Sequence, residues 1–186
     1  MRRLALGVAV AVAVSAGAAQ ADTVEIQVDG AAKGTIEIEL LPDVAPNHVA
    51  QIEALAKAGA YDGVVFHRVI DGFMAQTGDV AFGKNGSGDL AKAGMGGSDL
   101  PDLKAEFSDI PFERGTVGMA RAMDPDSANS QFFIMFAPAP SLDGQYTVVG
   151  RVVAGQDVVD RIRRGDGPNG EVSDPDWMAR VTVRAD

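Results

Sequence analysis

The chain has 186 residues, no cysteine and a formal net charge of −10 at pH 7. This length fits one domain with a core large enough to be stable alone, and the lack of cysteine excludes disulfides and cysteine-linked lipids. Because an acidic protein repels nucleic acid and anionic lipid headgroups, we expect no nucleic-acid partner.

The first 21 residues have the layout of a secretory signal peptide. An arginine pair supplies the positive n-region, Leu4–Val14 is an apolar h-region, and Ala19-Gln20-Ala21 is an A-x-A cleavage site. A membrane span needs about 20 apolar residues, so a retained N-terminal anchor is the weaker alternative. We expect cleavage of residues 1–21 and a single exported domain, residues 22–186, with no membrane span. The expected location is the periplasm, and an extracellular destination is the alternative.

Two alternating runs, Thr23–Val28 and Gly34–Leu40, flank a turn signal at Asp29-Gly30. They predict a hairpin with one solvent-facing side. Pro46–Lys57 then carries apolar residues at helical spacing, and Gly59 is a stop signal. This pattern predicts an amphipathic helix that covers an open side of a sheet.

The next stretch predicts a second hairpin, because Val64–Phe66 and Phe73–Thr77 are rich in β-forming residues and flank a turn signal at Asp71-Gly72. Arg68 stands there among large apolar residues. Since arginine is rarely buried unpaired, it either leans out from a sheet or projects into a polar-floored pocket. The glycine-rich segment Ala81–Pro101 offers few apolar residues to bury, which predicts a long surface loop.

The second half of the chain alternates short apolar runs with turns. Strands are predicted at Thr116–Ala120, Gln131–Phe136, Val148–Val153 and Trp177–Arg184, with a helix at Gln156–Arg163 and a loop at Gly165–Pro175. Short strands and two helices without βαβ alternation predict a mainly β fold. We expect a closed eight-stranded antiparallel β-barrel capped by two helices, because closure removes exposed edge strands.

Common catalytic sites find little support in the residues. Two histidines and no thiol do not indicate a zinc cluster, and no G-x-S-x-G motif indicates a nucleophile elbow. Asp124-Pro125-Asp126 begins like a calcium loop but lacks its glycine and its final glutamate, and Gly83-Lys84 lacks the phosphate-loop spacing. We therefore expect no metal, no cofactor and a reaction that breaks no covalent bond.

Three motifs in order along the chain carry a family resemblance. Phe66–Asp79 matches F-H-R-hydrophobic-hydrophobic-x-G-F-M-x-Q-x-G-D. Gly118–Arg121 with Ser130–Ile134, and then Leu142–Gly144 leading into Val148–Val152, match the rest of the same site. On these motifs the chain resembles the cyclophilin family of peptidyl-prolyl isomerases. The resemblance implies a helix-capped barrel that accelerates X–Pro rotation in proline-containing polypeptides.

The resemblance also implies the residues of the site. Arg68 would donate a hydrogen bond to the prolyl nitrogen, and Gln76 would hold Arg68 and bind the substrate carbonyl. Phe73 is implied as the third catalytic residue. The remaining set comprises Met74, Phe133 and Leu142 around the proline ring beside Phe73, Ala120, Arg121 and Gln131 along the flanking peptide, His67 at the edge, and Tyr146 in the distal wall.

The distal wall departs from the family pattern. Ser141 stands where members often have an aromatic residue, Tyr146 where many have histidine, and Arg121 where others have asparagine. We expect weak binding of cyclosporin, because serine cannot supply the indole contact. We also expect Arg121 to favour substrates with an acidic residue near proline.

The residue pattern alone leaves plainer readings open. The apolar site residues could be ordinary core, and Arg68 could be a surface residue paired with Asp71 or Asp79. A non-catalytic module of the same fold could bind proline-containing segments as a chaperone or assembly factor. A structural envelope protein without a peptide site would leave the apolar cluster fully closed. Nothing in the sequence indicates more than a monomer.

Overall fold

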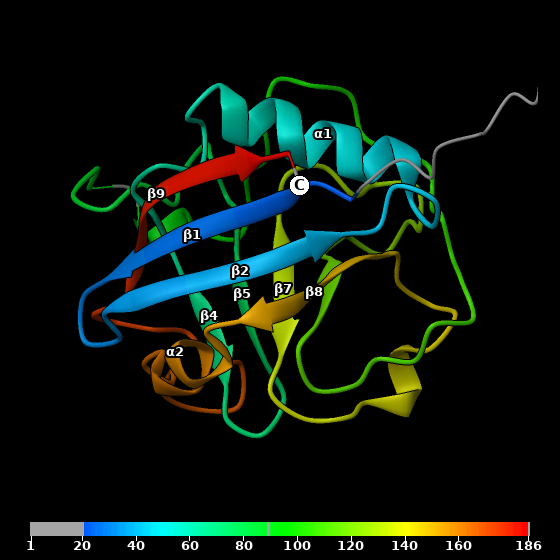
Figure 1. Ribbon diagram of the computed structural model, residues 1–186. Coiled ribbons are helices and arrows are strands. Elements are labelled where there is room, and N and C mark those ends of the chain that lie inside the picture. The colour runs from blue at the N-terminus through cyan, green and yellow to red at the C-terminus, as the bar shows by residue number, and fades with distance from the viewer. Residues whose placement is uncertain (1–20, 89, 186) are drawn as a thin grey trace, which may run out of the picture.

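The computed structural model describes residues 21–88 and 90–185, so the predicted signal segment lies outside the described residues apart from Ala21. Within them the chain forms one curled antiparallel sheet and two α-helices (Figure 1). The strands are β1 (Thr23–Asp29), β2 (Gly34–Leu40), β3 (Val64–Val65), β4 (Arg68–Ile70), β5 (Met74–Thr77), β6 (Thr116–Met119), β7 (Phe132–Met135), β8 (Val148–Ala154) and β9 (Trp177–Arg184). The helices are α1 (Pro46–Lys57) and α2 (Gln156–Arg161), with 3-10 turns η1 (Leu90–Lys92) and η2 (Pro140–Leu142).

The described sheet has nine strands, in the order β3-β9-β1-β2-β8-β6-β7-β5-β4. The prediction of a closed eight-stranded barrel is therefore corrected to a curled nine-stranded sheet. The predicted strand Val64–Phe66 explains the difference: β3 pairs with β9, while the hairpin partner of β5 is the separate strand β4. The two edge strands are joined only by Phe66 and His67, so the chain itself holds the edges together.

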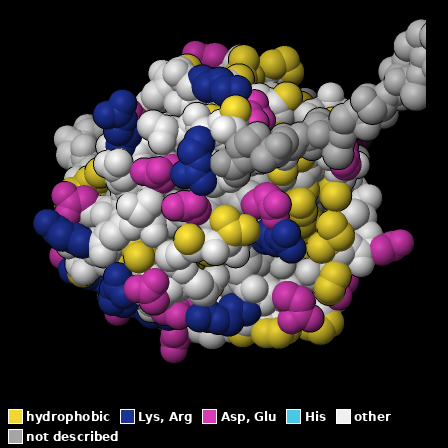
Figure 2. All heavy atoms as spheres, in the orientation of Figure 1, with side chains coloured by type: hydrophobic (Ala, Val, Ile, Leu, Met, Phe, Trp, Pro, Cys, Tyr) yellow, Lys and Arg dark blue, Asp and Glu magenta, His cyan; other side chains and the backbone are white. Residues whose placement is uncertain are grey.

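The first hairpin is confirmed, and its alternation separates the core from solvent. Ile26 of β1 and Ile36 of β2 are fully buried and face each other across the ladder. On the other side, Glu39 pairs with Arg151 of β8 at 2.6 Å. Figure 2 shows acidic and basic side chains interspersed over this face, with no single basic patch.

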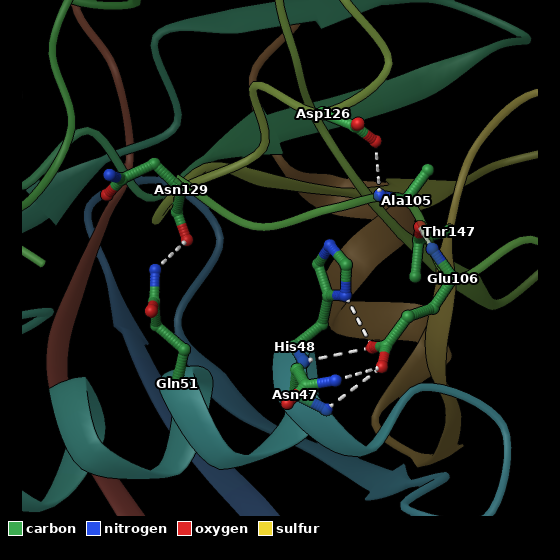
Figure 3. Close-up of polar contacts among 8 residues, drawn as sticks. All are labelled: Asn47, His48, Gln51, Ala105, Glu106, Asp126, Asn129 and Thr147. Carbon is green, nitrogen blue, oxygen red and sulfur yellow. Dashed lines mark hydrogen bonds and ion pairs between the residues drawn. The ribbon is translucent and has the colours of Figure 1, made fainter. Parts of the chain in front are cut away.

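Helix α1 has the predicted bounds, but its N-terminus is stabilised from a distant part of the chain. Pro46 occupies the first turn, and the N-cap residue makes no side-chain hydrogen bond. The Glu106 carboxylate instead accepts hydrogen bonds from the backbone N–H groups of Asn47 and His48 and from both their side chains (Figure 3). A carboxylate there satisfies free N–H groups and complements the helix dipole.

A second contact ties α1 to the loops above it. Gln51 Nε2 donates to the carbonyl of Asn129 at 3.1 Å and to that of Pro101 at 3.3 Å, and Figure 3 shows the first of these bonds. Helix α2 ends at Arg161, two residues before the predicted end, because the backbone turns out of the helix at Ile162. No helix among the described residues has the length and apolarity required to cross a membrane.

Two apolar clusters lie on opposite sides of the same strands. In β7, Phe132 and Ile134 belong to the main core inside the curled sheet, whereas Phe133 and Met135 belong to a smaller cluster on its outer face. Successive strand residues point to opposite faces, so a run of four buried residues serves both clusters. The smaller cluster also contains Met74 and Phe112. The candidate site lies on this smaller cluster.

Candidate active site

Strand register places the candidate residues in one row. Arg68 of β4 lies opposite Gln76 of β5, Gln76 lies opposite Phe133 of β7, and Phe133 lies opposite Gly118 of β6. Directly opposed residues share a face of the sheet. A guanidinium, an amide and an aromatic ring from three segments therefore meet on the outer face.

Gly118 lets two aromatic rings lie across this row. A Cβ atom at Gly118 would stand 2.6 Å from both Phe112 Cε1 and Phe133 Cζ. The rings of Phe112 and Phe133 are stacked with centroids 5.7 Å apart, and Tyr146 meets Phe133 edge-on at 5.8 Å. Packing on both sides holds the Phe133 ring in one position.

Beside this ring the surface carries a hollow of about 180 Å³, lined by apolar residues together with Arg68, Gln76 and Arg121. We call it the apolar hollow, after its floor. Met74 and Phe133 are buried and form its floor, whereas Phe73 and Leu142 are half-buried at its rim. The hollow brings together nine of the predicted site residues: Arg68, Phe73, Met74, Gln76, Ala120, Arg121, Phe133, Leu142 and Tyr146. The apolar cluster is thus open at the surface. A purely structural protein without a peptide site would have left it fully closed.

Arg68 is held in place while its charge stays uncompensated. Its Nε donates to the carbonyl of Asn169 at 2.9 Å, and Nη1 donates to Gln76 Oε1 at 3.1 Å. No residue in the described ranges forms an ion pair with it. Asp71 pairs with Arg164, and Asp79 accepts backbone N–H groups, so Arg68 is not the surface ion pair that the residue pattern left open. The guanidinium is therefore a fixed donor at the edge of an apolar hollow.

Arg121 closes the opposite side of the hollow. Its guanidinium donates to the carbonyls of Ala122, Met123 and Gln145 and lies 4.5 Å from the centroid of the Tyr146 ring. These contacts join the loop after β6 to the segment before β8. Positive charge thus remains beside the site, as expected, but the side chain also supports the distal wall.

A second, larger hollow of about 410 Å³ adjoins the apolar one and shares Gln76, Ala120 and Arg121 with it. We call it the side hollow. Its lining includes the predicted residue Gln131 and residues 94–98. Gln131 Oε1 accepts from Gln76 Nε2 at 2.9 Å, so Gln131 stands behind Gln76 and outside the apolar hollow.

His67 does not line either of these hollows. It is buried, with 8% of its surface exposed, and borders a separate depression between η1 and Val172. A Cβ atom at Gly94 would lie 3.0 Å from its ring, so the loop after β5 covers it. Burial lowers the pKa of His67 to about 4, which keeps the imidazole neutral at physiological pH.

Several residues that build the site were missed by the sequence reasoning. Asn169 fixes Arg68, and Gly94 and Gly96 bind Gln131, all through backbone carbonyls. A carbonyl that acts through the backbone leaves no side-chain signal to read. Phe112 could have been suspected, since it is a large apolar residue shortly before a strand. No three His, Asp or Glu side chains of the described residues are grouped so that they could hold a metal ion.

The fold and site together define a β-sheet protein with a hollow of about 180 Å³ beside a fixed arginine. The family described as "Cyclophilin type peptidyl-prolyl cis-trans isomerase/CLD" matches residues 23–183. The "Probable peptidyl-prolyl cis-trans isomerase" of Brucella suis is 61% identical over 155 residues, which cover 82% of this chain and 79% of that relative. The "Peptidyl-prolyl cis-trans isomerase B" of Bacillus subtilis is 39% identical over 132 residues, covering 70% and 85%.

Solved structures agree with the family match. A cyclophilin of Hirschia baltica superposes with a TM-score of 0.71 at 30% identity, covering 86% of this chain and 73% of that one. A cyclophilin-type isomerase of Cryptosporidium parvum gives 0.74 at 23% identity, covering 89% and 99%, and supports the fold alone. The chain belongs to the cyclophilin-type peptidyl-prolyl cis-trans isomerase family, and its enzymatic activity is that isomerisation.

Proposed function

We propose that the protein accelerates X–Pro rotation by placing the Arg68 guanidinium against the prolyl nitrogen of the twisted substrate. The observation that carries this proposal is a charged donor without an ion pair among the described residues, held by Asn169 and Gln76 at the rim of an apolar hollow. The proline ring would sit on Met74 and Phe133.

Amide resonance creates the barrier of about 18–20 kcal/mol that the enzyme must lower. In the twisted state resonance is lost and the lone pair localises on nitrogen, so that nitrogen can accept a hydrogen bond that the planar amide cannot. A donor at this position stabilises the transition state more than the ground state. Shortening an uncatalysed rotation of about 10–100 s to about a millisecond requires roughly 10⁴-fold, or about 5.5 kcal/mol. One charge-assisted hydrogen bond plus fixed orientation is of this size.

The flanking peptide would extend from the apolar hollow over the side hollow. Gln76, Ala120 and Arg121 border both hollows, which supports a continuous path for an extended segment. Arg121 would favour an acidic residue near proline. A series of peptides varied at that position should show a preference that salt screens, and equal rates would contradict it.

The test of Arg68 is a cis-to-trans isomerisation rate on residues 22–186 and on the variants Arg68→Ala and Arg68→Lys. Circular dichroism checks that each variant is folded. We expect Arg68→Ala to lose at least about tenfold in kcat/KM, which corresponds to about 1.4 kcal/mol of transition-state stabilisation. Lysine keeps the charge but not the fork of donors, so it should recover only part of the loss. A fully active Arg68→Ala would refute the role of the guanidinium.

We further propose that the protein acts outside the cytoplasm as a monomer, after removal of residues 1–21. The arginine pair, the apolar run and the A-x-A site support this part of the proposal. Cell fractionation and N-terminal sequencing should find a chain that begins at Asp22 in the periplasm, or in the medium if it is fully secreted. A cytoplasmic chain that retains Met1 would contradict export. Light scattering tests the monomer.

A further inference from the structure

A buried carboxylate lies at the end of β5, outside both hollows. Asp79 is fully buried, and no ion pair to it occurs in the described ranges. Its Oδ1 accepts from the backbone N–H groups of Ala81 and Phe82 at 3.1 and 2.9 Å. Its Oδ2 accepts from those of Gly94 and Gly96 at 2.7 and 2.9 Å. Four charge-assisted bonds compensate the burial of one carboxylate and fix the glycine turn above it.

The same two glycines present their carbonyls to the site. Gln131 Nε2 donates to the carbonyl of Gly94 at 3.0 Å and to that of Gly96 at 2.7 Å. The turn fits tightly, since a Cβ atom at Gly96 would lie 2.6 Å from Asp79 Oδ1 and 2.7 Å from Ala81 Cβ. The position of Asp79 therefore determines where the two acceptors for Gln131 stand.

These acceptors set the direction of two side-chain amides. Because the carbonyls take the Nε2 end of Gln131, its Oε1 end faces Gln76 and accepts from Gln76 Nε2 at 2.9 Å. Gln76 must then turn its Oε1 toward Arg68, whose Nη1 donates to it at 3.1 Å. If Gln131 were flipped, Gln76 would present its NH₂ group to the guanidinium, and two donors would face each other.

We propose that Asp79 is a positioning residue for Arg68, acting through the Gly94–Gly96 turn, Gln131 and Gln76. This inference rests on the proposed role of Arg68. The carboxylate touches neither the hollows nor the substrate path. Its effect is to keep the side-chain amides of Gln131 and Gln76 in one orientation. The guanidinium of Arg68 therefore always meets the acceptor Gln76 Oε1. Loss of Asp79 would leave the apolar hollow in place but let Arg68 adopt other positions, which lowers kcat more than it raises KM.

The decisive experiment is a double-mutant cycle with Asp79→Asn and Gln131→Ala. Asparagine keeps the size, but its NH₂ end cannot accept backbone N–H groups. We expect Asp79→Asn to lower kcat/KM by about tenfold, and by less than about twofold when Gln131 is already alanine, because groups in one network are not additive. Asp176→Asn is the matched control. Asp176 is also buried and also accepts backbone N–H groups, from Ala31, Ala32 and Arg163. The effects of Asp176→Asn and Gln131→Ala on kcat/KM should be independent and should therefore multiply.

A spectroscopic readout separates positioning from stability. The Nε–H resonance of Arg68 in a ¹H–¹⁵N spectrum, assigned by its loss in Arg68→Lys, should shift or broaden in Asp79→Asn and stay unchanged in Asp176→Asn. If Asp79→Asn does not fold, Gly96→Ala perturbs the same turn and enters the same cycle. If the effects of Asp79→Asn and Gln131→Ala on kcat/KM multiply and the Arg68 resonance is unchanged, the positioning role of Asp79 is overturned. Full activity of Arg68→Ala would instead overturn the proposed catalytic role of Arg68. The Arg68 resonance would still show whether Asp79 positions this side chain.

Discussion

The burial of His67 predicts that the protein loses stability in mild acid. Its side chain is 8% exposed, and neither ring nitrogen has a hydrogen-bond partner among the described residues. Burial therefore disfavours the charged imidazolium and lowers the pKa to about 4; the charge of Asp79 partly opposes this shift and that of Arg68 adds to it. In the unfolded chain the same histidine has its ordinary pKa of about 6.5.

The sign and size of the effect follow from this difference. Between about pH 6.5 and pH 4 the unfolded chain binds a proton that the folded protein does not, so acid favours unfolding. The contribution of His67 is complete above pH 6.5 and is lost as the pH falls to about 4. The difference between a pKa of about 6.5 in the unfolded chain and about 4 in the folded protein corresponds to about 3 kcal/mol. That is a large part of the stability of a typical domain.

The assay is urea unfolding at several values between pH 7 and pH 4, on the wild-type protein and on His67→Gln. Glutamine does not titrate, so its free energy of unfolding should fall less steeply, and the two curves should converge by about 3 kcal/mol toward pH 4. Carboxylates titrate in both proteins and cancel in the difference. Parallel curves would show that His67 keeps its ordinary pKa, and the reasoning from burial would be refuted.

Three further outcomes are expected. Glu106→Gln should destabilise the protein by about 1–2 kcal/mol in urea unfolding, because the N-terminus of α1 loses its charged acceptor. The control Glu113→Gln, at an exposed position, should change the stability little. Equal effects of the two variants would contradict the capping role of Glu106. Gly118→Ala should lower both the melting temperature and kcat/KM by displacing the Phe133 ring, at about 1–3 kcal/mol of stability; an unaltered enzyme would show that the ring can move freely. Cyclosporin should bind weakly in calorimetry, and Ser141→Trp should tighten it by at least about tenfold; tight binding by the wild-type protein would count against this.

Local patterns predicted the elements that depend on neighbouring residues. The bounds of α1 match the periodic run Pro46–Lys57, and β2 matches Gly34–Leu40. The family resemblance also named nine residues that the fold brings together around the apolar hollow. Their individual roles in catalysis stay predictions until the variants are measured.

Long-range pairing explains what the patterns did not predict. Val64–Val65 and Arg68–Ile70 are almost continuous in the chain, yet they pair with β9 and β5 at opposite edges of the sheet. Nothing in these few residues distinguishes one partner from the other. The α1 cap is similar, since Glu106 lies 58 residues beyond His48 and resembles any surface glutamate in the sequence.

Hydrophobic alternation and turn residues were thus sufficient for the mainly β class and for the helix α1, because they act over a few positions. The set of side chains around the hollow was implied by the resemblance of three motifs to the cyclophilin family. The three-dimensional arrangement was needed for the fixed guanidinium of Arg68 and for the amides of Gln76 and Gln131 behind it. Their partners are carbonyls of Asn169 and of the glycine turn. Every residue carries such a carbonyl, so its use is decided by where the folded backbone brings it.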